Sequence, residues 1–296
     1  MDKRTDEERD DSKEARGFGG FLRDLLQGIP WSESAHTEYS FGLDPPEARH
    51  MTIHNANGKT RVIGEERDDI EIFVEKRARA ETTQAANQML DEIELLCEEV
   101  AGGLEIDVEA PRRWKRHGTT NLLIHVPKDL EVAVISANGR VWIEGLRSAA
   151  HARSSNGPVT ISDIVGDVEV FTSNAKVSCN CTCGRLKARS SNGKILLEQH
   201  SGSIDASTSN GVIQALLSEV GTEGVALATS NGRVILELPK DVDGDIDVRV
   251  DNGVIRNHLE IEQTAADGRN GRLQGRLGRG GIPIKIRTSN GTISLR

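Results

Sequence analysis

Residues 154–211 read SSNGPVTISDIVGDVEVFTSNAKVSCNCTCGRLKARSSNGKILLEQHSGSIDASTSNG, and a single pattern fills the stretch. An Asn recurs every 18 residues, from Asn156 to Asn210, and Gly follows it except at Asn174, where Ala175 takes that place. Between the asparagines, apolar and polar residues alternate, and this period of two indicates strands with one buried face. The repeat predicts coils that stack equivalent residues on one another, each with two short strands and an Asn–Gly corner.

The repeat extends through residues 131–296, where the interval lengthens to 21 and finally to 38 residues. The corner asparagines are Asn138, Asn156, Asn174, Asn192, Asn210, Asn231, Asn252 and Asn290. We expect Gly beside them because a tight corner uses positive φ, and we expect the Asn side chains to form a hydrogen-bonded ladder. The last interval contains HLEIEQTAADGRNGRLQGRLGRGG (residues 258–281), which we interpret as a Gly/Arg-rich loop in one enlarged coil.

These features predict a mostly β protein whose main part is a parallel β-solenoid, similar to a β-helix, with coils of about 18 residues. With strands about 4.8 Å apart, its seven coils would rise roughly 34 Å. Residues 37–130 have shorter alternating runs and predict a β-rich N-terminal region, in which TTQAANQMLDEI (residues 82–93) is a helix candidate.

The first 30 residues differ from the rest of the chain. Residues 1–16 are almost entirely charged or polar, so we expect a disordered tail. Residues 17–30 predict a short amphipathic helix, which could dock on the protein or bind a membrane surface. Its apolar residues are Phe18, Phe21, Leu22, Leu25, Leu26 and Ile29.

Composition excludes several classes of protein. The 296 residues include 37 Lys and Arg against 46 Asp and Glu, a formal net charge of −9, which argues against a general nucleic-acid binder. The N-terminus lacks the apolar segment of a secretory signal, and no apolar run approaches the roughly 18–20 residues that span a membrane. Four cysteines do not suggest a disulfide framework. We therefore expect a cytoplasmic protein, with peripheral membrane association left open.

Three stretches resemble a known family. They are ARHMTIHNANGKTRVIGEERDDIEIFVEKRA (residues 48–78), LLIHVPKDLEVAVISANGRVWIEG (residues 122–145) and LGRGGIPIKIRTSNGTISLR (residues 277–296). Together with the TSNG and SSNG turns, they resemble the bacterial "putative adhesin" β-strand-repeat family, a domain of unknown function, over roughly residues 45–296. The resemblance implies a parallel β-helix-like fold and a role by analogy with β-helical surface proteins. It implies no catalytic residue.

CNCTC offers the first candidate for chemistry. Cys179 falls in the column of inward apolar residues and is interpreted as a core residue. Cys181 and Cys183 fall near the half-coil corner, close to His200 of the next coil, where a zinc or redox site is possible. We favour idle thiols.

Two charged segments and one short motif offer further candidates. Asp241, Asp243, Asp245 and Asp247 could hold calcium but lack EF-hand spacing, and a solvated acidic turn is favoured. Arg269, Arg272, Arg276 and Arg279 could hold an anion among glycines, although a mobile connection is favoured. Ser191 and Lys194 match S-x-x-K, but they lie in an Asn–Gly corner and not on the helix that this chemistry needs.

With no catalytic constellation and no cofactor motif, the sequence favours a non-enzymatic scaffold or interaction protein. Its flat polar faces would meet a protein or polysaccharide partner, and envelope association is possible. One outward column illustrates such a face: His151, Glu169, Lys187 and Asp205. A carbohydrate-processing β-helix enzyme and an end-to-end self-assembling scaffold are the alternatives.

Overall fold

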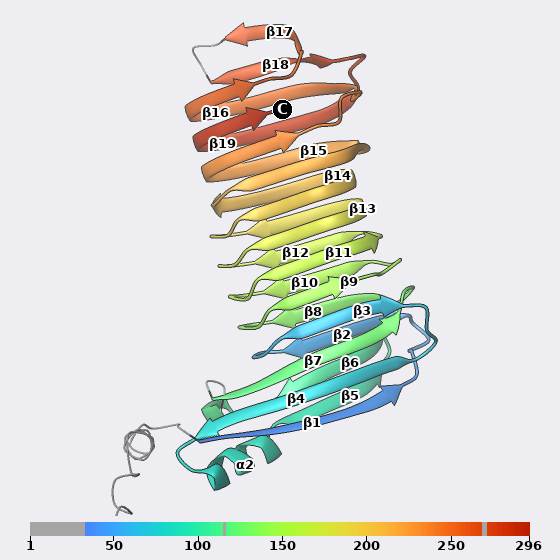
Figure 1. Cartoon of the computed structure of the whole chain (residues 1–296). Coiled ribbons are helices and arrows are strands. Elements are labelled where there is room, and N and C mark those ends of the chain that lie inside the picture. The colour runs from blue at the N-terminus through green and yellow to red at the C-terminus, as the bar shows by residue number, and fades with distance from the viewer. Residues whose placement is uncertain (1–32, 115–116, 268–270) are drawn as a thin grey trace, which may run out of the picture.

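The structure, a computed structural model, describes residues 33–114, 117–267 and 271–296 (Figure 1). The predicted tail and the predicted helix at residues 17–30 lie outside these ranges. The described elements are β1 (Glu33–Leu43), β2 (His50–Asn55), β3 (Thr60–Glu65), β4 (Ile70–Ala80), α2 (Thr83–Asp91), β5 (Glu94–Val100), β6 (Gly103–Glu109), a 3-10 turn (Arg112–Trp114), β7 (Gly118–Pro127), β8 (Glu131–Ser136), β9 (Val141–Glu144), β10 (Ala150–Ser154), β11 (Val159–Val165), β12 (Val168–Thr172), β13 (Val177–Ser190), β14 (Ile195–Asn210), β15 (Ile213–Glu237), β16 (Gly244–Asn257), β17 (Glu262–Asp267), β18 (Arg272–Leu277) and β19 (Ile282–Leu295).

The mostly β prediction is confirmed, and α2 lies within the predicted helix at residues 82–93. Thr82 begins this helix as its N-cap, because its hydroxyl oxygen accepts a hydrogen bond from the backbone N of Ala85 at 3.2 Å. The apolar side chains of the helix, among them Met89, face the protein and are buried.

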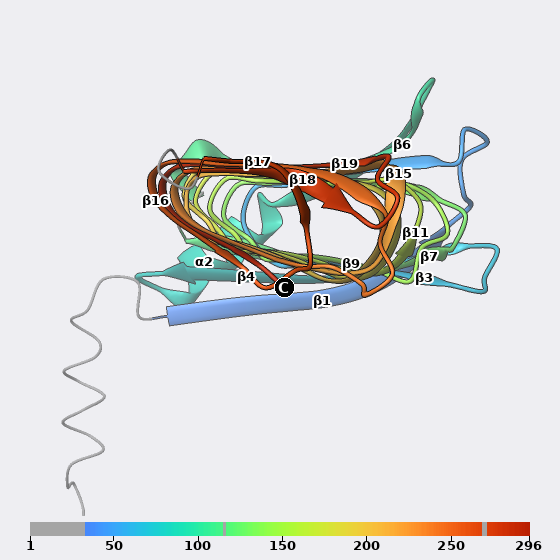
Figure 2. The same ribbon diagram turned by 90° about the horizontal axis from the view of Figure 1, so that it is seen from above.

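Parallel strands stack with an offset of one repeat. Val159 pairs with Val177, and Val177 pairs with Ile195, each 18 residues further along the chain. Strands that precede the Asn corner (β2, β8, β10, β12 and their continuations) form a first layer, and strands that follow it (β3, β9, β11 and their continuations) form a second layer. Figure 2 looks along the axis and shows these coils superimposed around a flattened interior.

Aliphatic side chains fill that interior. One core cluster runs from Met51 to Leu295 and is built almost entirely from Val, Ile, Leu and Ala. Cys179 is 1% exposed within it, and burial raises the pKa of its thiol to about 12, so the thiol stays protonated. The placement of Cys179 matches its interpretation as a core residue.

The glycines at the Asn corner are required by close stacking, and the expectation of positive φ is wrong for most of them. Gly157 has no positive φ, but a Cβ on it would lie 1.6 Å from the carbonyl oxygen of Gly139 in the coil below. The hydroxyl of Ser154 supports this corner by accepting a hydrogen bond from Gly157 N at 3.0 Å. The left-handed φ values lie at the opposite corner, where Asp163, Cys181 and Gln199 have φ of 51–52°.

Two coils lie out of sequence order. The coil formed by β2 and β3 lies between β6–β7 and β8–β9, although it comes first in the chain. At the other end, β19 lies between β15 and β16 and pairs with both in parallel. The interpretation of residues 258–281 as a loop in one enlarged coil is therefore wrong. This segment contains β17 and β18. β18 runs antiparallel beside β16, and β17 runs antiparallel on the other side of β18, before the chain returns into the stack.

Antiparallel strands cover both ends of the stack. At the N-terminal end, β4 and then β1 extend the second layer, β5 extends the first, and α2 contacts β1 and β4. At the C-terminal end, β18 and then β17 extend the first layer. The outermost described strands are therefore β1, β5 and β17, and each runs antiparallel to its neighbour within the chain. An end-to-end assembly would join two molecules through these strands and not through two parallel coils.

Candidate functional site

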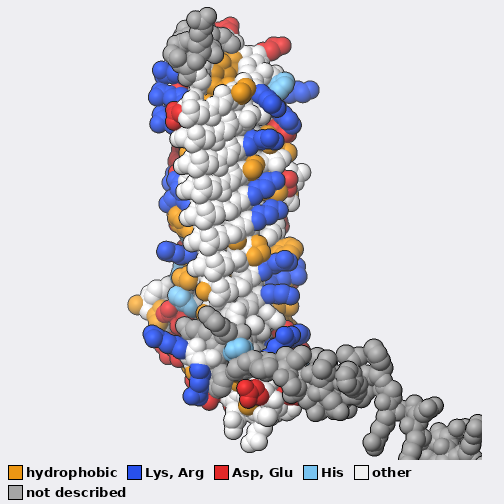
Figure 3. All heavy atoms as spheres, turned by 90° about the vertical axis from the view of Figure 1, so that its left-hand side faces the viewer, with side chains coloured by type: hydrophobic (Ala, Val, Ile, Leu, Met, Phe, Trp, Pro, Cys, Tyr) orange, Lys and Arg blue, Asp and Glu red, His pale blue; other side chains and the backbone are white. Residues whose placement is uncertain are grey.

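The eight corner asparagines form one row of hydrogen bonds. The Nδ2 of every asparagine after Asn138 donates to the Oδ1 of the preceding one in the row at 2.9–3.1 Å, in the order 138, 156, 174, 192, 210, 231, 290, 252. The residues of this corner are almost all uncharged. Figure 3 shows one long side of the molecule, with an uncharged strip along its length and Lys and Arg side chains on both flanks. The row is a structural feature that also gives the surface a regular polar edge.

The thiols and imidazole of the CNCTC candidate point in different directions. Cys181 and Cys183 are exposed, and Cys181 Sγ donates to Gln199 Oε1 at 2.9 Å. His200 is 1% exposed and points into the interior, where its Nδ1 lies 2.9 Å from the hydroxyl oxygen of Thr182. The structure therefore does not bring the three candidate ligands together.

The aspartates and arginines that the sequence offered as separate candidates meet at the C-terminal end. Asp243 accepts hydrogen bonds from the backbone N of Arg279 at 2.8 Å and from its Nε at 3.1 Å. Those bonds hold the pKa of Asp243 below its usual range. The pairing continues along β16 and β18, with Asp245 beside Arg276 and Asp247 beside Arg272. These ion pairs join the antiparallel strand β18 to β16 of the stack. Arg269 lies outside the described residues.

The outward column has the predicted order. His151, Glu169, Lys187 and Asp205 follow one another in register on the first layer. Lys187 Nζ bonds Glu169 Oε1, and Asp205 is held by Arg189, which comes from the strand that carries Lys187. The charges are thus paired along the surface.

The second layer has a groove that the sequence did not predict. It encloses about 530 Å³ and crosses β1, β4, β7 and β3 near the N-terminal end. Phe73 and Leu123 are register partners on neighbouring strands and form an apolar platform at its base, with Phe73 39% exposed. The imidazole ring of His125 supports Phe73 edge-on at 5.8 Å.

Polar groups surround this platform. Glu75 accepts a hydrogen bond from Asn121 at 2.6 Å and another from Arg77, and these bonds hold the pKa of Glu75 below its usual range. Glu38, Ser40 and the Lys59 ammonium also line the groove and make no hydrogen bond or salt bridge with another described side chain. Their polar atoms can therefore bind hydroxyl groups of a ligand.

One rim of the groove is rigid. The Arg61 guanidinium lies 4.9 Å from the centre of the Trp142 ring and bonds Glu144 Oε1 at 2.6 Å. Trp142 Nε1 donates to the other oxygen of the same carboxylate at 3.1 Å. This cluster combines cation–π stacking with paired hydrogen bonds, so it fixes the side chains beside the apolar platform.

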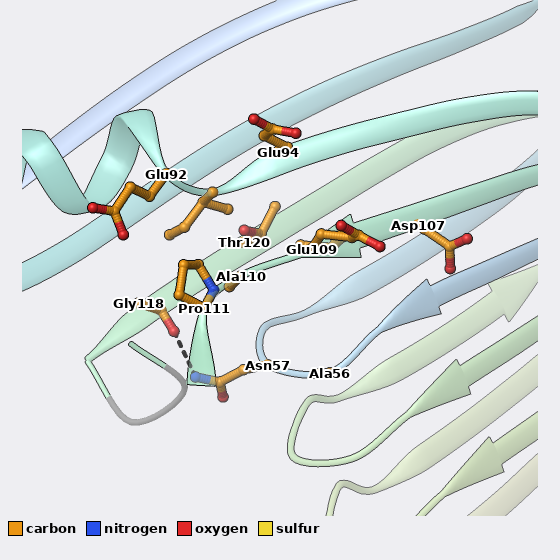
Figure 4. A pocket seen from close by; sticks show the side chains of 12 residues that line it. Ala56, Asn57, Glu92, Glu94, Asp107, Glu109, Ala110, Pro111, Gly118 and Thr120 are labelled. Atoms are coloured by element: carbon orange, nitrogen blue, oxygen red, sulfur yellow. Dashed lines mark hydrogen bonds between the residues drawn. The ribbon is translucent and has the colours of Figure 1, made fainter. Parts of the chain in front are cut away.

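A second cavity, of about 600 Å³, lies at the N-terminal end beside the Asn corner (Figure 4). Glu92 lines it from the segment that joins α2 to β5, Glu94 from the start of β5, and Asp107 and Glu109 from β6. No Lys or Arg is among its lining residues, although Glu92 bonds Arg113 at 2.6 Å.

Sequence reasoning missed both cavities because their residues come from strands far apart in the chain. The available signal was the alternation in IEIFVEK and TNLLIHV, which places Phe73 and Leu123 on outward positions. Large apolar residues that gather at outward positions mark a binding surface, whereas single ones are common. Recognising that these two residues are adjacent required the antiparallel register of β4 and β7.

Comparison with known proteins gives a family. Two solved structures resemble the chain: a "putative adhesin" from Bacteroides fragilis NCTC 9343 (13% identity, TM-score 0.49, covering 88% of this chain and 97% of that one) and a "putative cell adhesion protein" from Clostridium sporogenes ATCC 15579 (11% identity, TM-score 0.31, covering 88% and 99%). A search of curated proteins finds no match. The family model described as Toastrack DUF4097 matches residues 48–296, which confirms the family resemblance of the TSNG and SSNG turns. The chain belongs to the DUF4097 toastrack family.

Proposed function

We propose that this protein is a non-enzymatic, adhesin-type scaffold that binds a polysaccharide in the groove over β1, β4, β7 and β3. The proposal rests on the half-exposed apolar platform of Phe73 and Leu123. Beside it lie polar side chains whose hydrogen-bonding groups are not used by other described side chains. The parallel β-solenoid supplies a rigid support, because each coil is hydrogen-bonded to its neighbours.

The groove suits a sugar chain for chemical reasons. A pyranose ring has faces of C–H bonds and a rim of hydroxyl groups, so it needs an apolar platform and nearby hydrogen-bonding groups together. Phe73 and Leu123 offer the first, and Glu38, Ser40 and Lys59 offer the second. The groove is open to solvent, as an extended polymer requires, and the Arg61–Trp142 rim limits the ordering that binding would demand.

A carbohydrate-processing enzyme is the second candidate, because Glu38 and Glu75 lie directly opposite each other on β1 and β4. Glycoside hydrolysis uses two carboxyl groups, one of which must be protonated to act as an acid. Glu75 does not fit that role, because its two oxygens accept hydrogen bonds from Asn121 and Arg77 and its pKa is held low. The enzyme would therefore need Glu38 as its acid, with Glu75 as the nucleophile or base. Because Glu38 is exposed on the outermost strand β1, binding without turnover is the favoured function.

The first experiment measures whether the full chain is retained on a panel of polysaccharides, each immobilised on a solid support. The affinity for the polysaccharide that retains the protein best is then measured in solution. Phe73→Ala is expected to lower the affinity at least tenfold, because it removes the platform. The matched control is Phe171→Ala, which removes a partly exposed aromatic ring from the other layer and should leave the affinity unchanged.

Three outcomes would contradict the proposal. The groove is excluded if Phe73→Ala binds as well as the wild-type protein, and polysaccharide binding is excluded if the wild-type protein retains no ligand. Release of reducing ends from a bound polysaccharide, lost in Glu38→Gln, would support the enzyme instead.

A further inference from the structure

The strands β5 and β6, at the N-terminal end of the first layer, carry an unbalanced negative charge. Residues 91–110 contain eight Asp and Glu and no Lys or Arg. In the antiparallel pair of β5 and β6, Glu94 lies directly opposite Glu109, and Glu98 lies directly opposite Glu105. Like charges at directly opposed positions destabilise a sheet, so a bound cation would stabilise this surface.

One histidine projects into this surface from the neighbouring coil. β2 and β6 pair in parallel with His54 opposite Asp107, and Glu105 lies two residues earlier on the same outward side of β6. The ligand atoms of His54, Glu105 and Asp107 all lie within 4.8 Å of one another, and all three side chains are half-buried. Asp107 makes no hydrogen bond or salt bridge with another described side chain, so its carboxylate is available.

The spacing of the first two ligand atoms is compatible with a metal site. His54 Nε2 lies 3.3 Å from Glu105 Oε1. Two ligands on a tetrahedral zinc ion, at about 2.0–2.1 Å each, are separated by about 3.3–3.4 Å. An oxygen of Asp107 lies within 4.8 Å of both ligand atoms, and the backbone register holds the three Cα positions beside one another.

The donor set selects the class of ion. Imidazole nitrogen is a good ligand for zinc and neighbouring transition metals, whereas calcium and magnesium take oxygen ligands. One imidazole and two carboxylates also leave a coordination position open for water, as in zinc sites with three protein ligands. We infer that His54, Glu105 and Asp107 form a binding site for a zinc-class divalent cation on the first layer of the fold.

The adjoining cavity gives the ion a path of entry. Asp107 is shared between the three-residue site and the cavity of about 600 Å³, whose other carboxylates are Glu92, Glu94 and Glu109 (Figure 4). An acidic cleft raises the local concentration of cations. The site lies on the opposite layer from the polysaccharide groove and is independent of it.

The test is isothermal titration of the full chain with ZnCl2, in a Cys181→Ser/Cys183→Ser background that removes the exposed thiols as competing ligands. One zinc ion should bind per chain. His54→Ala and Asp107→Asn should each weaken this binding at least tenfold, whereas CaCl2 should give no saturable binding at the same concentrations.

The matched control is His151→Ala. His151 is as exposed as His54 (36% against 37%) and its Nε2 also lies 3.3 Å from a carboxylate oxygen, that of Glu131. Glu169 lies 3.7 Å from the other ring nitrogen, Nδ1, so among the described residues the three side chains do not bring one ligand atom each within 4.8 Å of one another. Zinc affinity should be unchanged in this variant, and circular dichroism should show that all variants are folded. The inference is overturned if His54→Ala binds zinc like its parent, or if His151→Ala loses as much affinity as His54→Ala.

Discussion

Asn290 donates a hydrogen bond from its Nδ2 to the Oδ1 of Asn231, 59 residues earlier in the chain, at 2.9 Å. Asn252 in turn donates to Asn290 at 3.1 Å, so the last asparagine of the sequence is the second from the end of the row. The strand β19 is therefore hydrogen-bonded on both sides. The C-terminal strand therefore lies between two other coils of the stack and does not form its end.

This position makes β19 important for stability. Ile286 is fully buried between Leu227 and Val248 of the two neighbouring strands, so Ile286→Ala should lower the free energy of unfolding by about 2–5 kcal/mol. Arg287→Ala, at the adjacent exposed position, should change it by less than about 0.5 kcal/mol. Urea denaturation followed by circular dichroism measures both. Equal stability of the two variants would mean that β19 is not part of the cooperative unit.

The asparagine row makes a prediction that depends on position. Asn192 donates to Asn174 and accepts from Asn210, whereas Asn252 at the end of the row makes one such bond, to Asn290. Because a side-chain hydrogen bond contributes about 0.5–1.5 kcal/mol, Asn192→Ala should cost about twice as much stability as Asn252→Ala. Comparison of the two denaturation midpoints tests this. A larger loss at Asn252 would show that the row does not act through its hydrogen bonds.

Much of the central stack could be predicted from the sequence because its order in space is its order in the chain. A fixed interval of 18 residues determines the register once one pair of strands is aligned, as Val159 and Val177 show. The corner glycines were also found, but for the wrong reason, because no local pattern reveals that the carbonyl of Gly139 lies against Gly157.

The ends of the stack and both cavities could not be predicted, because they depend on contacts that violate chain order. β2 enters between β6 and β8, so His54 meets Asp107, which lies 53 positions later in the chain. The Asp and Arg residues near the C-terminus were noticed separately, but their pairing required the antiparallel register of β16 and β18. A sequence pattern shows which residues of a strand point outward. It does not show which other strand lies beside them in the sheet.

Two adjacent glycines test the packing of the inserted coil. Gly103 has a φ of 129°, and a Cβ on it would lie 2.0 Å from the carbonyl oxygen of His50, whereas a Cβ on Gly102 would meet nothing within 4 Å. Gly103→Ala should therefore cost about 1–3 kcal/mol, through backbone strain and displacement of β2 from β6. Gly102→Ala should be nearly neutral. Thermal denaturation of the pair checks this, and equal midpoints would contradict the close approach of these strands.

The buried imidazole of His200 predicts a dependence of stability on pH. Burial lowers the pKa of His200, so as the pH falls the unfolded chain takes up a proton before the folded protein does. The contribution to stability is complete above the unfolded pKa of about 6.5 and is lost as the pH falls from there towards the lower folded pKa.

Replacing the polar pair should remove this slope. His200 is in register with Leu217 of the next coil, so Leu fits the column, and Thr182→Val avoids leaving the Thr182 hydroxyl unpaired. Between pH 7 and pH 5, the free energy of unfolding of the double variant His200→Leu/Thr182→Val should fall less than that of the wild-type protein. Urea titrations at each pH measure both values, and the window is set by the ordinary histidine pKa of about 6.5. His36→Ala, at an exposed position, should keep the wild-type slope. An unchanged slope in the double variant would assign the acid sensitivity to other groups, because His200 would then not be held neutral by its burial.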